Sequence, residues 1–344
     1  MALINLTERL NLQLPSPLVK VTPHELGIEG SHSVSLWLKH DDAIHPIISG
    51  NKWRKLAPTL TAYIEQHHQL PDQIVSFGGG HSNHLHALGY ICTRLNIELH
   101  AFVRGNYTHQ LTPCLADLDK WGANLHWLTK LEYKQRHDLT YIATLQSKYP
   151  NALFIPEGGS NEHAPLGVAK CINEIVTQLK NVSHINTHHT QPLLYQRHLI
   201  ITPVATAATL AGLIYGVAQQ MEIHPHLDIE ILGIAVLKAH INEASNYLEG
   251  LTLAHLHKLI PDTHHRSIKL PIWKITPDFH EGGYAKSSPE LLDFCAQTMK
   301  FEPVYSGKVA FALKQLIEDN VLSNYDNVIM LHTGGLQGQR KTLI

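Results

Sequence analysis

Short apolar segments rich in β-branched residues alternate along this chain with longer amphipathic segments, and this alternation constrains the fold more than any other feature. The apolar segments, which we predict to be strands, cover residues 73–77, 98–103, 124–128, 198–204, 228–236 and 327–332. The amphipathic segments, which we predict to be helices, cover residues 83–95, 110–121, 133–149, 162–180, 207–221, 240–258, 288–300 and 307–319. Strands that alternate with helices form βαβ units with parallel sheets, so the sequence predicts an α/β protein.

The length of the chain predicts two domains. A hydrophobic core rarely grows beyond about 250 residues before the chain divides, and this chain has 344 residues. The polar segment 181–196 lacks helix signals and is predicted to be an exposed loop or insertion.

Charge and cysteine content exclude several classes of protein. The chain has 27 Lys and Arg against 29 Asp and Glu, a balance that argues against a nucleic-acid partner. Its four cysteines are far apart in the sequence, with no C-x-x-C motif, and this pattern is typical of a reducing compartment rather than a disulfide framework. The sequence shows neither a signal-peptide pattern nor a run of ~18 apolar residues. We therefore expect a soluble, cytoplasmic protein without a membrane partner.

The 27 histidines suggest a metal site. Many of them stand in adjacent pairs, and adjacent side chains cannot converge on one ion from a regular helix or strand. These pairs include His67-His68, His188-His189 and His264-His265. We predict that most histidines lie on the surface and that the protein has no metal site.

Three loops that follow predicted strands are rich in Gly, Ala, Ser and Thr. They lie in "SFGGGHSNH" (76–84), "ITPVATAATLAGLIYG" (201–216) and "IMLHTGGLQGQ" (329–339). In parallel α/β folds, ligands bind at the carboxyl ends of the strands, and amide groups at a helix start favour anions. Each loop alone is explained equally well by helix capping or tight packing. The three together indicate one anionic cofactor bound at several points.

Known motifs narrow the choice of cofactor. The chain lacks the G-x-G-x-x-G dinucleotide spacing, a Walker loop and a G-x-S-x-G serine-hydrolase motif. A lysine in "SGNKWRKL" (49–56) completes a set that suits pyridoxal phosphate. That cofactor needs an amine, a phosphate site, a partner for its ring nitrogen and a loop for the substrate carboxylate.

The whole chain resembles the fold-type II pyridoxal-phosphate family that contains 1-aminocyclopropane-1-carboxylate deaminase and D-cysteine desulfhydrase. The matching blocks, in family order, are "HDDAIHPIISGNKWRKL", "SFGGGHSNHLHA", "PEGGSN", "LGVAKCINEI", "GGYAKSSPEL", "EPVYSGK" and "HTGG". The resemblance implies two three-layer α/β/α domains with mainly parallel sheets and the cofactor in the cleft between them. The small domain would cover 46–156, and the large one 1–45 with 157–344. A homodimer and a small amino-acid substrate are also implied.

The same resemblance implies roles for individual residues. Lys52 would bind the cofactor covalently and move the substrate α-proton, while Asn83 would hydrogen-bond the ring hydroxyl. The implied catalytic residues are Lys52, Ser82, Tyr284 and Tyr305. The implied substrate-binding residues are Ser82, Asn83, His84 and Tyr284. The implied cofactor-binding residues are Lys52, Lys55, Asn83, Ala205, Thr206, Ala207, Ala208, Thr209, Ser306 and Thr333.

Ordinary structural roles are the alternatives for some of these residues. Tyr284 and Tyr305 could be half-buried core residues, and Lys55 could be a solvated helix residue. We expect Arg54 to be structural.

The chain departs from the family pattern in its phosphate loop. That loop is usually of the type G-x-G-G-T, whereas this chain has alanines at 205, 207 and 208. An alanine at a position that needs positive φ is strained, and each added methyl group narrows the loop. We therefore expect weaker cofactor binding.

A second departure concerns the ring nitrogen. The cyclopropane-opening deaminases of the family carry Glu after the matched tyrosine and Leu after the final-strand histidine, whereas this chain has Ser306 and Thr333. A hydroxyl leaves the ring largely neutral and makes it a weaker electron sink than a carboxylate does. We therefore predict α,β-elimination from a small amino acid with a good β-leaving group, resembling D-cysteine desulfhydrase. The open alternatives are 1-aminocyclopropane-1-carboxylate deaminase, a serine-type racemase or dehydratase, and a pyridoxal-phosphate-binding protein that has lost catalysis.

Overall fold

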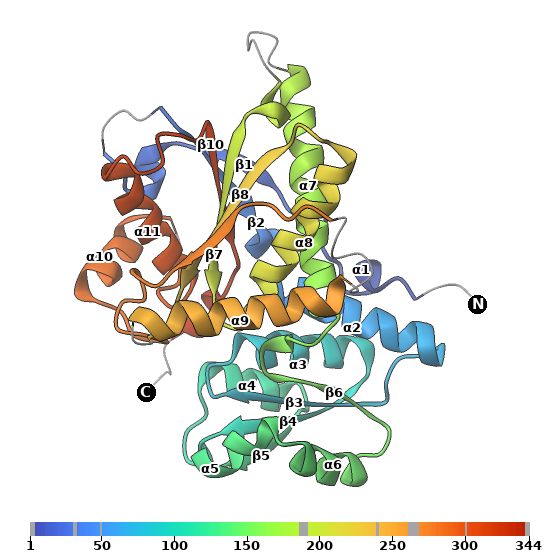
Figure 1. Ribbon diagram of the computed structural model, residues 1–344. Helices are drawn as coiled ribbons and strands as arrows, with labels where there is room; N and C mark the ends of the chain where they lie inside the picture. The colour runs from blue at the N-terminus through green and yellow to red at the C-terminus, as the bar shows by residue number, and fades with distance from the viewer. Residues whose placement is uncertain are drawn as a thin grey trace. The chain divides into compact units, whose positions relative to one another are not determined.

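The computed structural model describes residues 4–29, 33–48, 50–185, 192–238, 241–260, 268–299 and 301–340 (Figure 1). The chain folds into two compact units. Unit 1 comprises residues 1–14, 44–164 and 335–344, and unit 2 comprises residues 15–43 and 165–334. The predicted domains differ from these units at the chain ends, where the sequence analysis assigned residues 1–14 and 335–344 to the large domain.

Unit 2 is built on a six-stranded sheet with the strand order β1-β2-β10-β7-β8-β9. Only β1 is antiparallel to its neighbour. The strands are β1 (Leu18–Val21), β2 (Ser35–His40), β7 (Arg197–Val204), β8 (Asp228–Ala235), β9 (Trp273–Thr276) and β10 (Asn327–His332). The helices are α7 (Ala164–Ile185), α8 (Ala208–Ile223), α9 (Ile241–Leu259), α10 (Pro289–Gln297) and α11 (Ser306–Glu318), with 3₁₀ turns at Pro23–Leu26, Asp41–Ile44 and Leu193–Tyr195.

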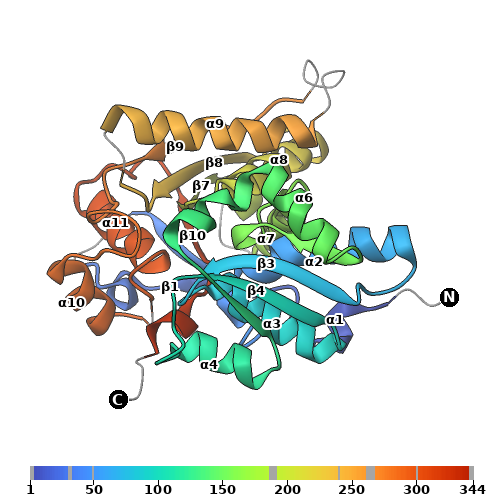
Figure 2. The same ribbon diagram turned by 90° about the horizontal axis from the view of Figure 1, so that it is seen from below.

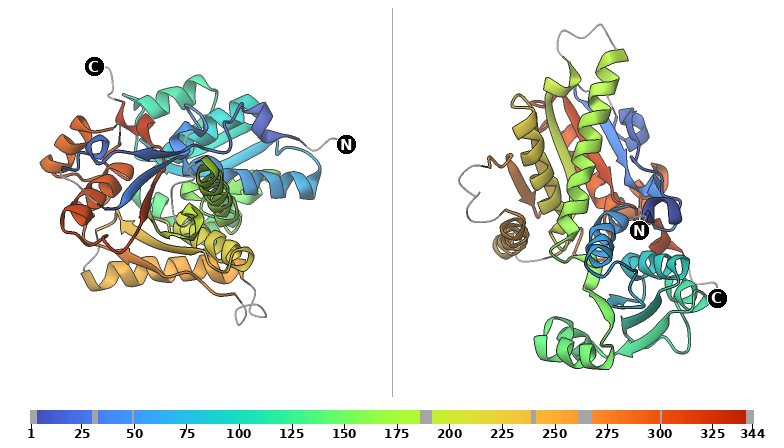
Figure 3. Two further views of the ribbon diagram at one scale, coloured as in Figure 1. Left: turned by 90° about the horizontal axis from the view of Figure 1, so that it is seen from above. Right: turned by 90° about the vertical axis from the view of Figure 1, so that its right-hand side faces the viewer.

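Helices cover both faces of this sheet, because its buried strands are apolar on both sides. In β7, Ile200 faces a core shared with α7, α8 and α9, while Leu199 and Ile201 face a core shared with α10 and α11. Figure 1 shows α7 and α8 on one side of the sheet and α10 and α11 on the other. The right-hand view of Figure 3 shows the long yellow-green helix α7 running alongside the strands. Unit 2 is therefore a three-layer α/β/α structure.

Unit 1 contains a fully parallel four-stranded sheet with the order β5-β4-β3-β6. Its strands are β3 (Gln73–Gly79), β4 (Glu98–Arg104), β5 (Asn124–Leu128) and β6 (Ala152–Ile155). Its helices are α1 (Leu6–Arg9), α2 (Asn51–His67), α3 (Asn83–Leu95), α4 (Pro113–Lys120), α5 (Lys130–Lys134) and α6 (Leu139–Lys148), with 3₁₀ turns at Gln135–His137, Glu157–Gly159 and Leu336–Gln339. Figure 2 shows α3 and α4 on one side of β3 and β4, with α6 on the other side. The prediction of two three-layer α/β/α parts with mainly parallel sheets is confirmed.

The predicted elements differ from the structure in two helical regions. The predicted helix 133–149 is divided into the end of α5, a 3₁₀ turn and α6, because Asp138 caps a new helix by accepting from the Tyr141 amide. The predicted loop at 181–196 is wrong in its first part, because α7 continues to Ile185. Residues 186–191 lie outside the described residues.

The last described residue is attached to unit 1 by an ion pair. The Arg340 guanidinium lies 2.6 Å from the Asp117 carboxylate, which is also 2.7 Å from the His86 ring. Asp117 belongs to α4 and His86 to α3. The pKa of the Asp117 carboxyl is lowered by its hydrogen bonds to Arg340 and His86, which outweigh the opposing effect of burial.

The remaining global expectations concern membranes, cysteines and histidines. Within the part of the chain that the structure describes, no helix combines the length and the apolar character that crossing a membrane requires. All four cysteines are free thiols. His67 and His68 are exposed, but several histidines are buried, among them His84, His86, His100 and His198. The pairs His188-His189 and His264-His265 lie outside the described residues.

Candidate active site

Several of the predicted site residues of unit 2 gather at one edge of its sheet. Strands β7, β8, β9 and β10 are parallel, so the segments that follow them emerge at the same edge. Residues 205–209 follow β7, Tyr284 lies in the segment after β9, and Thr333 follows β10 directly. Gly334 and Gly335 have positive φ angles of 75° and 108°, which turn the chain immediately after Thr333. This edge is the expected position of a ligand in a parallel α/β unit.

The phosphate-loop residues form the start of α8. Ala207 is the N-cap of this helix and has a left-handed backbone with φ of 59°, and an alanine side chain cannot cap the helix. The Ala208 amide donates to the Thr206 carbonyl at 2.8 Å, which closes the turn. The first amides of a helix have no partner within the helix and favour an anion. The start of α8 therefore has the character of a phosphate site.

The strained backbone of Ala207 leads to a prediction. A left-handed conformation costs a non-glycine residue roughly 1 kcal/mol, so Ala207→Gly should raise the unfolding free energy by up to about 1 kcal/mol, measured by chemical denaturation. Removal of the methyl group also widens the loop, so pyridoxal phosphate should bind more tightly. Cofactor titration of the apoprotein measures the affinity. Ala208→Gly is the matched control, since Ala208 is the first residue of α8 and gains no relief. Equal gains from both glycines would contradict the prediction.

The two predicted tyrosines of unit 2 contact each other. The Tyr305 hydroxyl donates to the Tyr284 hydroxyl at 2.9 Å, and the rings stand edge to face with centroids 6.0 Å apart. Tyr284 is 54% exposed, so it is not a core residue. The Tyr284 phenol is therefore accessible to solvent and accepts a hydrogen bond from Tyr305.

A buried carboxylate that the sequence did not indicate organises the start of α11. Glu302 is 2% exposed and accepts hydrogen bonds from the amides of Val304, Tyr305 and Ser306 at 2.6–3.0 Å. The Ser306 hydroxyl donates to Glu302 Oε1 at 3.1 Å. Burial raises the pKa of Glu302 to about 7, although each of these hydrogen bonds acts in the opposite direction. Glu302 therefore fixes the backbone of Tyr305 and Ser306 together.

A buried lysine fixes the segment that carries Tyr284. Lys308 Nζ donates to the carbonyl oxygens of His280 and Gly283, each at 2.7 Å. Gly283 needs its positive φ of 119°, and a Cβ there would lie 2.8 Å from Cβ of Lys238. Burial lowers the pKa of Lys308 to about 8. Glu302 thus fixes the backbone of Tyr305. Lys308, in the first turn of α11, fixes the segment that carries Tyr284.

In unit 1 the two candidate lysines lie in the first turns of α2. Gly50 precedes the helix with φ of 68°, a conformation that favours glycine, and Lys52 is half-buried. Lys55 is buried and donates to the Ser160 hydroxyl at 3.1 Å. The pKa of Lys55 is well below its usual range, first because of burial and second because of the charge of Lys52. The solvated alternative for Lys55 is therefore wrong, and Arg54 is buried as well.

His84 lies close to these lysines rather than on the surface. Its Nε2 is 2.8 Å from the Ser76 hydroxyl, which donates to the Ile155 carbonyl. Burial, followed by the charges of Lys52 and Lys55, lowers the pKa of His84 to about 3. Its ring is therefore neutral at physiological pH. Unit 1 thus gathers two amines, a neutral imidazole and a serine hydroxyl around the start of α2.

The glycine loop of unit 1 ends in the helix start that the sequence predicts. Ser82 is the N-cap of α3, and its hydroxyl accepts from the Leu85 amide at 3.2 Å, so its own hydrogen remains available to donate. A Cβ on Gly80 would lie 2.5 Å from the Tyr107 ring. Glycine is therefore required for this close approach. Strand β3 extends through Gly79, two residues beyond the predicted end.

Asn83 provides the test of whether these residues fit pyridoxal phosphate. Its Oδ1 is buried and has no hydrogen-bond partner within the described chain. An unpaired buried amide group costs about 1–3 kcal/mol unless a ligand satisfies it. The amide offers an acceptor and a donor group, either of which suits a ring hydroxyl. In unit 1, the unpaired Asn83 oxygen suits the cofactor's ring hydroxyl and the amines of α2 suit its covalent attachment. In unit 2, the start of α8 suits its phosphate.

Replacing this orphan amide should separate stability from binding. We expect Asn83→Ala to lower pyridoxal-phosphate affinity about tenfold, the effect of one lost hydrogen bond. The unfolding free energy of the apoprotein should remain within about 1 kcal/mol of the wild-type value, because the buried oxygen has no protein partner to lose. Cofactor titration and chemical denaturation measure the two effects. A large loss of apoprotein stability with unchanged affinity would assign Asn83 a structural role instead.

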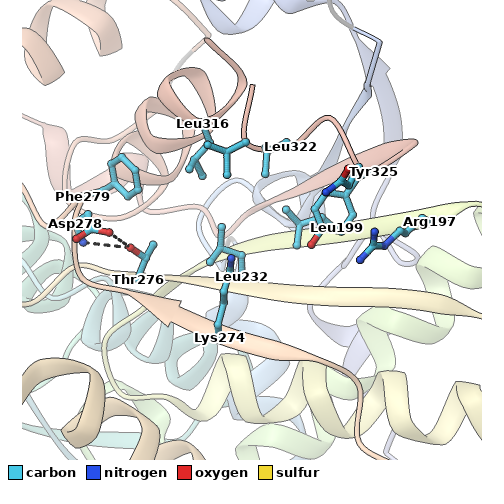
Figure 4. Close-up of a pocket in the computed structure, with 12 residues that line it drawn as sticks. Arg197, Leu199, Leu232, Lys274, Thr276, Asp278, Phe279, Leu316, Leu322 and Tyr325 are labelled. Carbon is cyan, nitrogen blue, oxygen red and sulfur yellow. Dashed lines mark hydrogen bonds between the residues drawn. The ribbon is translucent and has the colours of Figure 1, made fainter. Parts of the chain in front are cut away.

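A cavity of about 340 Å³ in unit 2 is separate from these residues (Figure 4). Its lining includes Arg197 of β7, Lys274 and Thr276 of β9, and Leu322 and Tyr325 between α11 and β10. None of the predicted site residues lines it. The cavity therefore does not belong to the candidate active site.

Sequence reasoning missed four residues that hold the site: Ser76, Ser160, Glu302 and Lys308. All four fall within blocks that matched the family, and this position was the available signal. Their roles depend on burial and on partners distant in sequence, such as the contact between Lys55 and Ser160. A motif alone does not provide that information.

Comparisons with known proteins agree with the fold and with the predicted family. The family model described as "Pyridoxal-phosphate dependent enzyme" matches residues 10–334. The chain is 26% identical over 353 residues to the Arabidopsis thaliana protein named "Bifunctional D-cysteine desulfhydrase/1-aminocyclopropane-1-carboxylate deaminase, mitochondrial", covering 94% of this chain and 77% of that protein. It is 22% identical to D-cysteine desulfhydrase of Serratia proteamaculans, covering 87% and 86% of the two chains.

A solved structure shares the fold along nearly the whole chain. The structure described as an ACC deaminase homologue aligns with a TM-score of 0.70 and 21% identity, covering 97% of this chain and 96% of that chain. The family model spans both units and every predicted site residue. This chain therefore belongs to the family of pyridoxal-phosphate dependent enzymes.

Proposed function

We propose that the protein is a pyridoxal-phosphate dependent lyase that catalyses α,β-elimination from a small amino acid with a good β-leaving group. A D-cysteine-like substrate and water would give pyruvate, ammonia and sulfide. The observation that carries this proposal is the identity of Ser306, a buried hydroxyl at the position where a carboxylate would face the ring nitrogen. The names of relatives such as the D-cysteine desulfhydrase of Serratia proteamaculans support it.

Residues of both units would hold the cofactor. Lys52 would bind it covalently, Asn83 would pair with its ring hydroxyl, and the start of α8 at residues 205–209 would bind its phosphate. Ser306 and Thr333 would face the ring nitrogen. Lys55 is an auxiliary partner for the phosphate. When bound, pyridoxal phosphate supplies an electron sink that stabilises negative charge at the substrate α-carbon.

The protein side chains would handle the protons. Lys52 Nζ would remove the α-proton, and Ser82 with the first amides of α3 would bind the substrate carboxylate, supported by His84. The Tyr284 hydroxyl accepts a hydrogen bond from Tyr305, so its own hydrogen is free to pass to the departing sulfur. The Tyr305 hydrogen bond would then stabilise the phenolate until water reprotonates Tyr284.

Three alternatives use the same residues. A 1-aminocyclopropane-1-carboxylate deaminase would open a carbon–carbon bond, which needs a stronger electron sink than a hydroxyl provides. A serine-type racemase would return a proton to the same substrate α-carbon, whereas a dehydratase would eliminate water from the substrate. A pyridoxal-phosphate-binding protein without catalysis is the alternative that the alanine-rich loop favours.

A substrate panel tests the proposal. The purified protein is loaded with pyridoxal phosphate and incubated with D- and L-cysteine, β-chloroalanine, serine and 1-aminocyclopropane-1-carboxylate, and 2-oxo acid and sulfide are measured. We expect release of pyruvate and sulfide from cysteine, with Lys52→Ala as the inactive control. Turnover of the cyclopropane acid without turnover of D-cysteine would refute the assignment. Racemised substrate without 2-oxo acid would indicate a racemase, and no turnover would indicate a binding protein.

We further propose a cytoplasmic homodimer. Four free thiols with no disulfide suit a reducing compartment, and the family resemblance implies the dimer. Light scattering of the purified protein measures the oligomeric state, and a monomer at micromolar concentration would contradict it.

A further inference from the structure

The ring-nitrogen partner of this chain is not an isolated hydroxyl. Ser306 is fully buried, and its hydroxyl donates to Glu302 Oε1 at 3.1 Å. Glu302 is itself 2% exposed, and within the described residues its carboxylate accepts hydrogen bonds from the backbone at the start of α11 and from the Ser306 hydroxyl. Ser306, which stands where the cyclopropane-opening deaminases carry glutamate, is thus hydrogen-bonded to a buried carboxylate.

The alternative partners of this carboxylate are occupied elsewhere. Lys308, the nearest lysine along α11, directs its ammonium group to the carbonyls of His280 and Gly283. Its charge interacts with Glu302 only over a longer range. Since no salt bridge neutralises Glu302 in the described chain, its charge is balanced by amide dipoles and by the Ser306 hydroxyl alone. Burial raises the pKa of Glu302 to about 7, against the opposing effect of these hydrogen bonds.

We propose that Glu302 acts through Ser306 as the positioning residue that sets the protonation of the cofactor ring nitrogen; this inference rests on the proposed function, which places Ser306 at that nitrogen. A serine hydroxyl has one hydrogen and two acceptor lone pairs. While Ser306 donates to ionised Glu302, its oxygen can only accept, so it favours a protonated nitrogen. If the carboxyl takes the proton, it donates to Ser306 Oγ, and Ser306 donates its own hydrogen to the bare nitrogen.

The two arrangements contain the same number of protons. Passing from one to the other moves one proton from Ser306 to Glu302 and one from the nitrogen to Ser306, with no external acid or base. Glu302 therefore restores, across one hydroxyl, part of the charge that a glutamate at position 306 would supply. The electron sink is stronger than that of a hydroxyl alone and remains weaker than that of a direct carboxylate.

The test uses the holoenzyme loaded with pyridoxal phosphate labelled with ¹⁵N in the ring. The ¹⁵N chemical shift reports the protonation of that nitrogen directly and does not depend on turnover. In the wild type we expect a shift between those of the protonated and the unprotonated cofactor. Glu302→Gln, which keeps an acceptor for the helix amides but has no charge, should move the signal by more than half of the distance towards the unprotonated cofactor.

The matched background is Ser306→Ala, which removes the hydroxyl between Glu302 and the ring nitrogen and leaves Glu302 in place. Glu302→Gln should add no further shift there, and Ser306→Thr, which keeps a hydroxyl, should retain the wild-type shift. An equal effect of Glu302→Gln with and without the Ser306 hydroxyl would overturn the proposal, as would no effect at all. If Glu302→Gln does not fold, Glu302→Asp takes its place, because the shorter side chain withdraws the carboxylate from Ser306 and should give the same pattern.

The two proposals fail in different ways. Loss of the covalent bond between Lys52 and the cofactor, seen by borohydride reduction and mass spectrometry, would contradict the proposed function. A cofactor that is bound at Lys52 but whose ring nitrogen does not respond to Glu302 would overturn this inference alone.

Discussion

Lys52→Ala is expected to abolish covalent attachment of the cofactor and to lower turnover by at least about 10³-fold. A positioned general base contributes typically 10²–10⁴-fold, and loss of the covalent bond adds to this effect. Lys52 is half-buried in the first turn of α2, so its removal should leave the fold intact. The measurement is borohydride reduction of the loaded protein, followed by peptide mass spectrometry and by the pyruvate assay.

The control for this variant is Lys130→Ala. Lys130 also lies in the first turn of a unit 1 helix, α5, but it is exposed. Its replacement should change neither attachment nor turnover. Lys55 supplies the competing explanation, because it is a buried amine of lowered pKa that lies close to Lys52. Cofactor trapped on Lys55 in the wild-type protein would transfer the covalent role from Lys52 to Lys55.

Lys308→Met is expected to lower the unfolding free energy by about 2–4 kcal/mol and turnover by at least about tenfold. The variant removes the donor for two carbonyls, those of His280 and Gly283, and a buried polar group without a partner costs about 1–3 kcal/mol. The released segment carries Tyr284, so its hydrogen bond with Tyr305 should weaken. Chemical denaturation and steady-state kinetics measure the two effects.

Lys314→Met is the matched control on the same helix. Lys314 is partly exposed and pairs with Glu318 one turn on, a contact worth only about 0.3–0.5 kcal/mol. Kinetics of Tyr284→Phe in the two backgrounds separate the mechanisms. If Lys308 acts through Tyr284, Tyr284→Phe should cost less in Lys308→Met than in the wild type. Equal costs in both backgrounds would show that Lys308 stabilises the fold without positioning the tyrosine.

The parts of the fold that the sequence predicts are those with strong periodic signals. Strands β5 and β10 begin and end at the predicted residues, and α3 covers its predicted range. The four missed strands, β1, β2, β6 and β9, are short or carry charge. Strand β2 includes Lys39, which is buried because its ammonium group meets Glu174, Gln178 and the Ser16 carbonyl. Tertiary pairing of this kind overrides local polarity and is not visible in a local pattern.

In the candidate site, too, the sequence predicts the positions of residues but not the effects of tertiary contacts. Family blocks give the positions of Lys52, Asn83 and Ser306, but not the surroundings that decide their chemistry. Burial gives Lys55 a lowered pKa, which a solvated helix residue would not have, and it makes His84 a neutral ring. Ser306 reads as an isolated hydroxyl in the sequence and meets a carboxylate in the fold. Desolvation and through-space contacts depend on residues that fold together from distant segments.

The ion pair of Arg340 with Asp117 bears on the order in which the protein can mature on the ribosome. The apolar core of unit 1 draws on residues 6–12 and 44–155, all of which leave the ribosome before the second half of the chain. The guanidinium that meets Asp117 beside His86 belongs to residue 340, which is made after all of unit 2. Until residue 340 is made, unit 1 must therefore persist with that carboxylate paired to His86 and not to Arg340. A nascent chain stalled before residue 340 would consequently hold a unit whose apolar core is complete but which lacks the ion pair between Arg340 and Asp117.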